Sequence, residues 1–197
     1  AATKAGIKPI IGMEAYIAPG SRKEKKGAGK GGTKAAYHLL LLAKNFTGYR
    51  NLMKLTSKAY LNGFYYKPRI DFDLLGEHAD GLIGLSACLQ GQINQALLKE
   101  QVKHARELAG RFREVLGPEN FFIELQDHGL SEQKTANKNA VEISKRTGIP
   151  LVATNDAHYL NRDDSFAHDV LLCIGTQRNL EDPDRLRYAG SEFYIKT

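Results

Sequence analysis

FFIELQDHGLSEQKTANKNAVEISKRTGIPLVATNDAHY, at residues 121–159, is one complete strand–helix–strand unit and sets the expected fold class. Residues 121–126 and 150–154 are short apolar runs typical of buried strands. Between them, residues 131–147 show a helical pattern, and Gly148 stands where helices commonly end. Alternation of this kind predicts an α/β fold in which helices cover a sheet of parallel strands.

The same alternation continues outward along the chain. We expect further strands at 7–17, 81–86 and 192–195, and helices at 47–62, 71–76, 94–116 and 162–174. The apolar run at 37–43 is either a strand or another core-facing segment. The opening residues AATKAG are typical of the last turn of a helix that ends at Gly6. Because a domain seldom begins inside a helix, we interpret the chain as a piece of a longer polypeptide that lacks at least one upstream βα unit.

Composition narrows the class of protein. The 197 residues are 25% charged and 42% hydrophobic, as in one globular domain. No apolar run approaches the roughly 18 residues of a membrane span, and no secretory signal is present, so we expect a cytoplasmic protein without a membrane partner. Cys88 and Cys173 stand alone, which excludes a disulfide framework or a four-cysteine zinc site within the chain. We expect Cys173 in the core.

Positive charge is concentrated in residues 20–34, a glycine-rich loop. The formal net charge of the chain is +6, and this loop carries six cations against the single acid Glu24. Glycine at this density opposes both helix and strand. A cation cluster favours a nucleic-acid backbone as its partner, and a solvated loop without a partner is the alternative. The candidate DNA-binding residues are Arg22, Lys23, Lys25, Lys26, Lys30 and Lys34.

Polar side chains stand at the ends of several expected strands, where functional residues gather in βα architectures. Asp156 and His158 are two residues apart, so on an extended strand they would point to the same side and could bind one metal ion. Carboxylate, imidazole and thiolate ligands suit zinc or manganese, and the thiolate favours zinc. Such a metal would polarise a phosphodiester and supply hydroxide at neutral pH. The full candidate set is Glu14, His38, Cys88, Glu124, Asp127, His128, Asn155, Asp156 and His158.

Each candidate also has a structural interpretation. Glu14, inside an apolar run, could be held by a salt bridge. His38 could be a hydrogen-bonded core histidine, and Cys88 a small buried hydrophobe. His128 could cap the turn before Gly129.

Seven segments of the chain closely resemble the PHP (polymerase and histidinol phosphatase) domain of bacterial replicative DNA polymerase III alpha subunits. They are IGMEAY, HLLLLAKNFTGYRNLMKL, GFYYKPRID, GLIGLSACLQGQI, FFIELQDHG, VATNDAHY and SEFYIKT, which together cover essentially the whole chain. The segments FTGYRNL, FYYKPRI and FYIKT distinguish this resemblance from one to histidinol phosphatases or family X polymerases.

The resemblance implies a distorted, TIM-like barrel of seven βα units. Residues 1–197 would be its C-terminal five units, with the first two missing from this chain. It also implies divalent metal ions, with four ligands upstream of Ala1 and none at His128. The remaining ligands would be Glu14, His38, Cys88, Asp156 and His158. With all five present, the resemblance implies a 3′–5′ exonuclease that proofreads DNA, in which Asp156 and His158 would be catalytic.

The parent protein implied by the resemblance is a DNA-directed DNA polymerase. Its magnesium-dependent polymerase carboxylates would lie beyond this chain, which alone would neither polymerise nor bind metal tightly. The implied partners are primer–template DNA, the remainder of the polymerase chain, a sliding clamp and a separate proofreading exonuclease. The alternative function is a non-catalytic module that stabilises the polymerase and docks that exonuclease.

Overall fold

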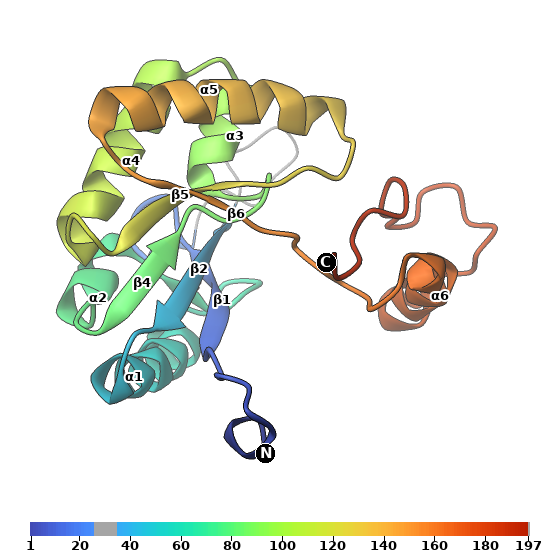
Figure 1. Cartoon of the computed structure of the whole chain (residues 1–197), viewed down its shortest axis with the longest axis horizontal. Helices are drawn as coiled ribbons and strands as arrows, with labels where there is room; N and C mark the ends of the chain where they lie inside the picture. The colour runs from blue at the N-terminus through green and yellow to red at the C-terminus, as the bar shows by residue number, and fades with distance from the viewer. Residues whose placement is uncertain (26–34, 197) are drawn as a thin grey trace.

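The computed structural model describes residues 1–25 and 35–196, which form a mixed α/β structure (Figure 1). Its six described strands form a sheet in the order β3-β1-β2-β4-β5-β6. The strands are β1 (Gly12–Ile17), β2 (Tyr37–Ala43), β3 (Arg69–Ile70), β4 (Leu82–Leu85), β5 (Phe121–Leu125) and β6 (Leu151–Ala153). The helices are α1 (Phe46–Asn62), α2 (Phe72–Glu77), α3 (Gln92–Leu98), α4 (Val102–Leu116), α5 (Ser131–Thr147) and α6 (Ser165–Thr176), with 3-10 turns η1 (Thr3–Ala5) and η2 (Arg162–Asp164).

The sheet is only partly parallel. Strands β4 and β5, and β5 and β6, pair in parallel, as expected. Strand β3, which was not expected, also pairs in parallel with β1. The expectation of a parallel sheet is wrong at β2, which runs antiparallel to both β1 and β4. No described helix lies between β1 and β2, whereas α5 provides the crossover that joins the parallel strands β5 and β6.

The two faces of β1 and β2 differ, and this difference positions the site. Ala15 and Ile17 of β1 are buried together with Leu39 and Leu41 of β2, in the core against which α1 packs. Side chains alternate across a strand, so Glu14, Tyr16 and His38 belong to the opposite face, which is more open to solvent.

Local sequence signals explain where the main helices begin and end. The Asn45 side chain caps α1 by accepting a hydrogen bond from Gly48 N at 2.9 Å. Leu52, Leu55 and Ala59 form the buried face of α1, as its apolar spacing predicts. Helix α5 ends at Gly148, whose φ of 68° suits glycine.

Three expected elements differ from the structure, and one observed strand was not expected. The helix expected at 94–116 is divided into α3 and α4, because Glu100 adopts a left-handed φ of 59° that apolar spacing does not reveal. The expected strand at 7–17 begins only at Gly12, since the preceding apolar residues are exposed and outside the sheet. The segment 192–195 makes a single bridge, from Tyr194 to Tyr159, in place of a strand. Strand β3 was too short for its pattern to predict.

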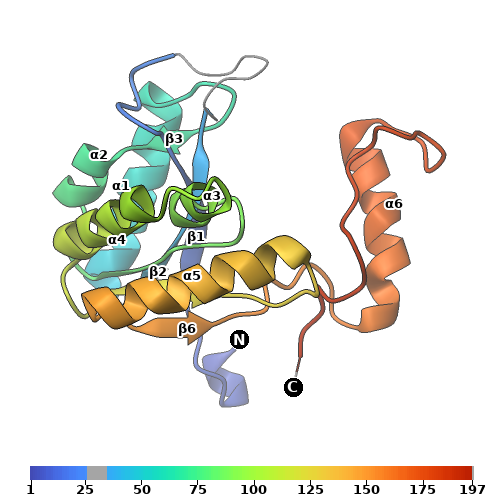
Figure 2. The same cartoon turned by 90° about the horizontal axis from the view of Figure 1, so that it is seen from above.

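The C-terminal part of the described chain stands to one side of the sheet. Figures 1 and 2 both show α6 and the segment after it separated from α1 to α5. Cys173 of α6 is buried, as expected, while Leu171 and Ile174 are exposed. Within the described residues, no helix combines the length and apolarity needed to cross a membrane.

Candidate metal centre

Three predicted ligands converge where β1, β2 and the loop after β4 meet. In the β1–β2 register, Glu14 is opposite Leu40 and Tyr16 is opposite His38, so Glu14 and His38 are diagonal neighbours on one face. The Glu14 Oε1 to His38 Nδ1 distance is 2.5 Å, and Cys88 Sγ lies 3.6 Å from the same nitrogen. One ligand atom from each of the three residues lies within 4.8 Å of the others.

Backbone contacts bring Cys88 to this position. The His38 N–H donates to Gln90 O at 3.1 Å, and the Gly91 N–H donates to Cys88 O at 2.9 Å. A Cβ atom at Gly91 would lie 2.1 Å from Ser86 O, so only glycine allows this tight loop. The loop after β4 is therefore tied to the start of β2.

Electrostatics show that these three side chains suit a positive charge. Hydrogen bonding to Cys88 and then to Glu14 raises the pKa of His38 to about 9. Hydrogen bonding from His38 in turn lowers the pKa of Glu14. A carboxylate and a sulfur therefore stabilise positive charge at one imidazole, and the same donor atoms are those that zinc prefers.

Asp156 and His158 reach the same cavity by a different route from the one expected. Strand β6 ends at Ala153, and Asp156 has a left-handed φ of 44°, so the pair does not lie on an extended strand. A cavity of about 810 Å³ is nevertheless lined by both residues and by Glu14, His38 and Cys88. Asp156 and His158 are not part of the three-residue group within 4.8 Å.

Neighbouring groups hold Asp156 and His158 in the cavity wall. His158 Nδ1 lies 2.8 Å from Asp156 O, and His158 Nε2 lies 3.0 Å from the Tyr188 hydroxyl oxygen. Burial and the charge of Glu14 raise the pKa of Asp156, while the charge of His158 opposes this shift. The five predicted ligands thus share one cavity and one electrostatic environment.

His128 lines this cavity and holds the turn that carries Asp156. Its Nε2 lies 2.6 Å from Asn155 O and its Nδ1 lies 2.7 Å from Gln133 Nε2. Its ring stacks on Phe193 with a centroid distance of 4.0 Å. The expected cap on the turn before Gly129 comes from Asp127 Oδ1 instead, which accepts from the Gly129 N–H at 2.9 Å.

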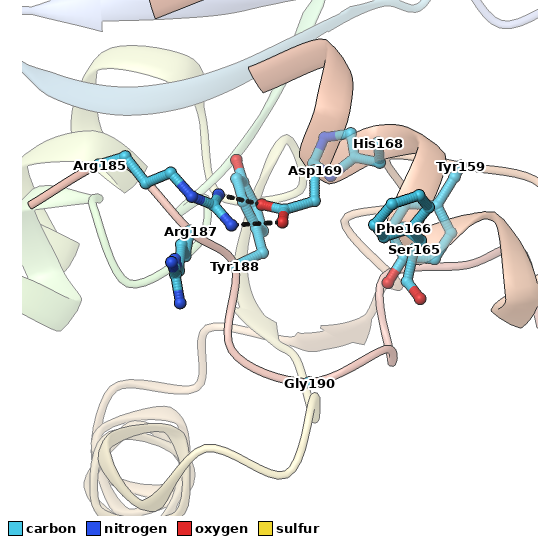
Figure 3. A pocket seen from close by; sticks show the side chains of 9 residues that line it. All are labelled: Tyr159, Ser165, Phe166, His168, Asp169, Arg185, Arg187, Tyr188 and Gly190. Atoms are coloured by element: carbon cyan, nitrogen blue, oxygen red, sulfur yellow. Dashed lines mark hydrogen bonds and ion pairs between the residues drawn. The ribbon is translucent and has the colours of Figure 1, made fainter. Parts of the chain in front are cut away.

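Sequence reasoning missed Tyr188, which carries no motif and lies 30 residues from His158. Figure 3 shows it at a second pocket, where Nη1 and Nη2 of Arg185 face the Asp169 carboxylate. The volume of this pocket is about 290 Å³. Tyr188 and Arg187 line both this pocket and the larger cavity. Only the fold reveals them as neighbours of the site.

The predicted DNA-binding residues fall into two groups. Arg22 is engaged inside the protein, where its Nη1 lies 2.7 Å from Asp71 Oδ1. Lys23 and Lys25 are exposed to solvent. The remaining three, Lys26, Lys30 and Lys34, lie outside the described residues.

A family model described as "PHP domain" matches residues 1–128. A DNA polymerase III subunit alpha from Treponema pallidum (strain Nichols) is 53% identical over 192 residues, which is 98% of this chain and 16% of that protein. The proteins of the same name from Thermus aquaticus and Mycobacterium tuberculosis (strain CDC 1551 / Oshkosh) are 50% and 42% identical over 196 and 207 residues, and each match covers 100% of this chain. The chain spans only 16% to 18% of the length of these three relatives.

Proposed function

Because this chain belongs to the PHP domain family, we propose that it is the PHP domain of a DNA polymerase III alpha subunit and binds divalent metal through Glu14, His38 and Cys88. The observation that carries this proposal is the convergence of one carboxylate, one imidazole and one thiol within 4.8 Å. In the parent protein, the described sheet would be part of a seven-stranded barrel whose first two βα units lie upstream. Primer–template DNA and the other replisome subunits would be its partners in the cytoplasm.

The donor set fits zinc better than magnesium or manganese. Magnesium and manganese prefer oxygen ligands, whereas a thiolate together with an imidazole is typical of zinc. Cys88 is therefore the residue that decides metal preference in this proposal. Asp156 and His158, in the same cavity wall, would complete the ligand set together with residues upstream of Ala1.

We propose that the reaction is removal of a 3′-terminal nucleotide by hydrolysis of a phosphodiester. A bound divalent metal would supply a Lewis acid and lower the pKa of a coordinated water. The protein's own part is to orient the groups around the 3′ end. Tyr188 and the Asp156 carbonyl fix the His158 ring, and the cavity of about 810 Å³ gives room for the end of a strand.

The test uses the full-length parent polymerase, freed of other nucleases. Asp156→Ala and His158→Ala should abolish release of a 3′-terminal label from a primer, while nucleotide addition continues. Cys88→Ser should weaken zinc binding by the parent protein. Cys173→Ser is its matched control, because Cys173 is buried in α6 and does not line the cavity.

The alternative, a non-catalytic module that stabilises the polymerase and docks a separate exonuclease, gives the opposite outcome. In that case the wild-type parent protein releases no label, and Asp156→Ala lowers only thermal stability or exonuclease docking. Release of label that survives both Asp156→Ala and His158→Ala would also refute the catalytic proposal.

A further inference from the structure

The turn at residues 64–67, called the aromatic turn below, displays large side chains that the proposed metal centre does not use. Phe64 is 51% exposed and Tyr66 is 68% exposed. Tyr66 has a φ of 58°, which is unfavourable for an aromatic residue. The Tyr65 N–H donates to Lys67 O at 3.0 Å and closes the turn. A strained turn that presents aromatic rings to solvent is typical of a binding surface.

The exposed rings on this surface are ordered by contacts with one another. The Tyr65 and Tyr66 ring centroids are 4.7 Å apart, and the Phe64 ring stacks on Tyr60 at 6.2 Å with an interplanar angle of 27°. Aromatic rings held in place in this way can stack with unpaired bases of any sequence.

The buried guanidinium of Arg69 joins the aromatic turn to the described residues at the ends of the glycine-rich basic loop (residues 20–34), which are called the root of the basic loop below. Arg69 Nη2 donates to Arg22 O at 2.8 Å and to Glu24 O at 2.9 Å. Arg69 Nη1 donates to Ala35 O at 3.2 Å, and the Arg69 guanidinium lies 5.1 Å from the centroid of the Tyr65 ring. The exposed Lys23 and Lys25, which flank Glu24 in the sequence, are therefore anchored close to the aromatic turn.

The aromatic turn is also connected to the metal centre. Lys67 Nζ lies 5.3 Å from the Tyr16 ring centroid, and the Tyr16 ring lies 5.3 Å from the His38 ring. A cavity of about 200 Å³ is lined by Glu14, Tyr16, Tyr60 and Pro68, among other residues. Lys67 and the Tyr16 ring thus lie between the aromatic turn and His38, one of the proposed metal ligands.

We propose that the aromatic turn, together with Lys23 and Lys25, binds single-stranded DNA and leads it toward the cavity that contains Glu14 and His38. Lysines on this path would neutralise phosphates, and the rings of Phe64 and Tyr66 would stack on bases. Stacking selects a single strand, because the bases of a duplex are already stacked on each other. This inference rests on the proposed function in one respect, which is that the bound strand is the substrate hydrolysed in that cavity.

The experiment measures binding of fluorescein-labelled oligodeoxythymidylate to the full-length parent protein by fluorescence anisotropy. Excess unlabelled blunt-ended duplex occupies the sites for double-stranded DNA, and EDTA prevents hydrolysis. Tyr66→Ala should weaken binding by about five-fold or more, whereas Tyr66→Phe should retain it. Lys67→Ala should reduce the slope of log affinity against log salt by about 0.7.

The matched control is Phe46→Ala, which removes an equally exposed ring (72%) from the other end of α1, about 24 Å away along the helix. It should leave binding unchanged. The proposal is overturned if Tyr66→Ala binds as wild type does, if Phe46→Ala has the same effect, or if the parent chain shields Tyr66 from chemical labelling.

Cross-linking adds a second readout that does not depend on a variant folding. An oligonucleotide that contains 5-bromodeoxyuridine should cross-link to the peptide that carries residues 64–67, and cross-links found only elsewhere would contradict the proposal. Binding is measured without metal, so its outcome is independent of hydrolysis. If Asp156→Ala leaves label release unchanged but Tyr66→Ala still weakens DNA binding, the proposed hydrolysis is refuted and the proposed strand-binding surface is supported.

Discussion

Replacing Asp71 should destabilise the chain, because this carboxylate stabilises both the root of the basic loop and the start of α2. Its side chain is only 4% exposed, and that of its partner Arg22 is 12% exposed. Asp71 accepts from Arg22 N at 2.9 Å, from Arg22 Nη1 at 2.7 Å and from Leu74 N at 3.0 Å. The last of these bonds is the N-cap of α2.

The expected magnitude follows from these contacts. Loss of an N-cap costs about 1 kcal/mol, and an unpaired buried charge costs about 3–5 kcal/mol. The two effects share one side chain, so Asp71→Ala should lower the free energy of unfolding by about 3–5 kcal/mol in total. Asp71→Asn keeps an oxygen that can cap α2 and loses the charge, so about 1.5–3 kcal/mol is expected.

The effect should also depend on pH. Burial raises the pKa of Asp71, but hydrogen bonds from Arg22 and Leu74 N outweigh it and hold the pKa below the ordinary value of 3.8. A carboxyl group whose pKa is lowered by folding stabilises the protein above that ordinary value. This contribution is lost as pH falls through the folded-state pKa. The difference between wild type and Asp71→Asn should therefore be complete at pH 7 and shrink below about pH 3.8.

Urea denaturation followed by circular dichroism at several pH values measures these quantities. Asp73→Ala is the matched control, because Asp73 is the exposed acid in the first turn of the same helix and its loss should cost at most about 0.5 kcal/mol. Equal effects of Asp71→Ala and Asp73→Ala on the free energy of unfolding would refute this role of Asp71. A difference between wild type and Asp71→Asn that does not change with pH would also refute it.

Three further predictions concern the core, a buried acid and the basic loop. Phe112→Ala should lower the free energy of unfolding, measured by urea denaturation, by about 3–5 kcal/mol. The reason is that the buried Phe112 ring packs between Phe72 and Phe121, with ring-centroid distances of 4.6 and 5.1 Å. A loss below about 1 kcal/mol would contradict this packing. Burial raises the pKa of Glu124 above 4.5, so the contribution of this carboxyl group to stability falls as pH rises. Glu124→Gln should therefore gain stability relative to wild type between pH 4 and pH 7. A stability difference that stays unchanged across that range in urea titrations would contradict this prediction. Replacing Lys23 and Lys25 by alanine in the parent protein should reduce the salt slope of single-strand binding by about 1.4, and an unchanged slope in anisotropy titrations would return these residues to the role of a solvated surface.

The sequence predicted most elements of the fold because their signals are local. The helix faces in α1 and α5, the glycine at the end of α5 and the apolar runs of β2 and β5 depend only on neighbouring residues. The division between α3 and α4 was missed because it depends on the backbone of Glu100, which the apolar spacing hides. The antiparallel direction of β2 depends on sheet pairing, which strand–helix alternation does not specify.

The sequence indicated which residues line the candidate site, but it did not predict how they are brought together. Three of the five residues, Glu14, His38 and Cys88, lie together because the antiparallel β1–β2 register and the loop after β4 bring them to one face. The expected parallel architecture did not predict this arrangement, since His38 is near the start of β2. Asp156 and His158 share their cavity through a left-handed turn, in place of the extended strand on which the prediction relied. The contacts of Tyr188 with His158 and of Phe193 with His128 were not predicted, because they join segments that are distant in the sequence and that only the folded chain brings together.

X-ray absorption at the zinc edge tests the central claim most directly, when it is applied to the full-length parent protein loaded with zinc. If Glu14, His38 and Cys88 hold the metal, the wild-type spectrum contains a sulfur neighbour at about 2.3 Å. That neighbour should disappear in Cys88→Ser and persist in Cys173→Ser. A wild-type spectrum with only nitrogen and oxygen neighbours, or a sulfur signal that survives Cys88→Ser, would contradict the proposed metal centre.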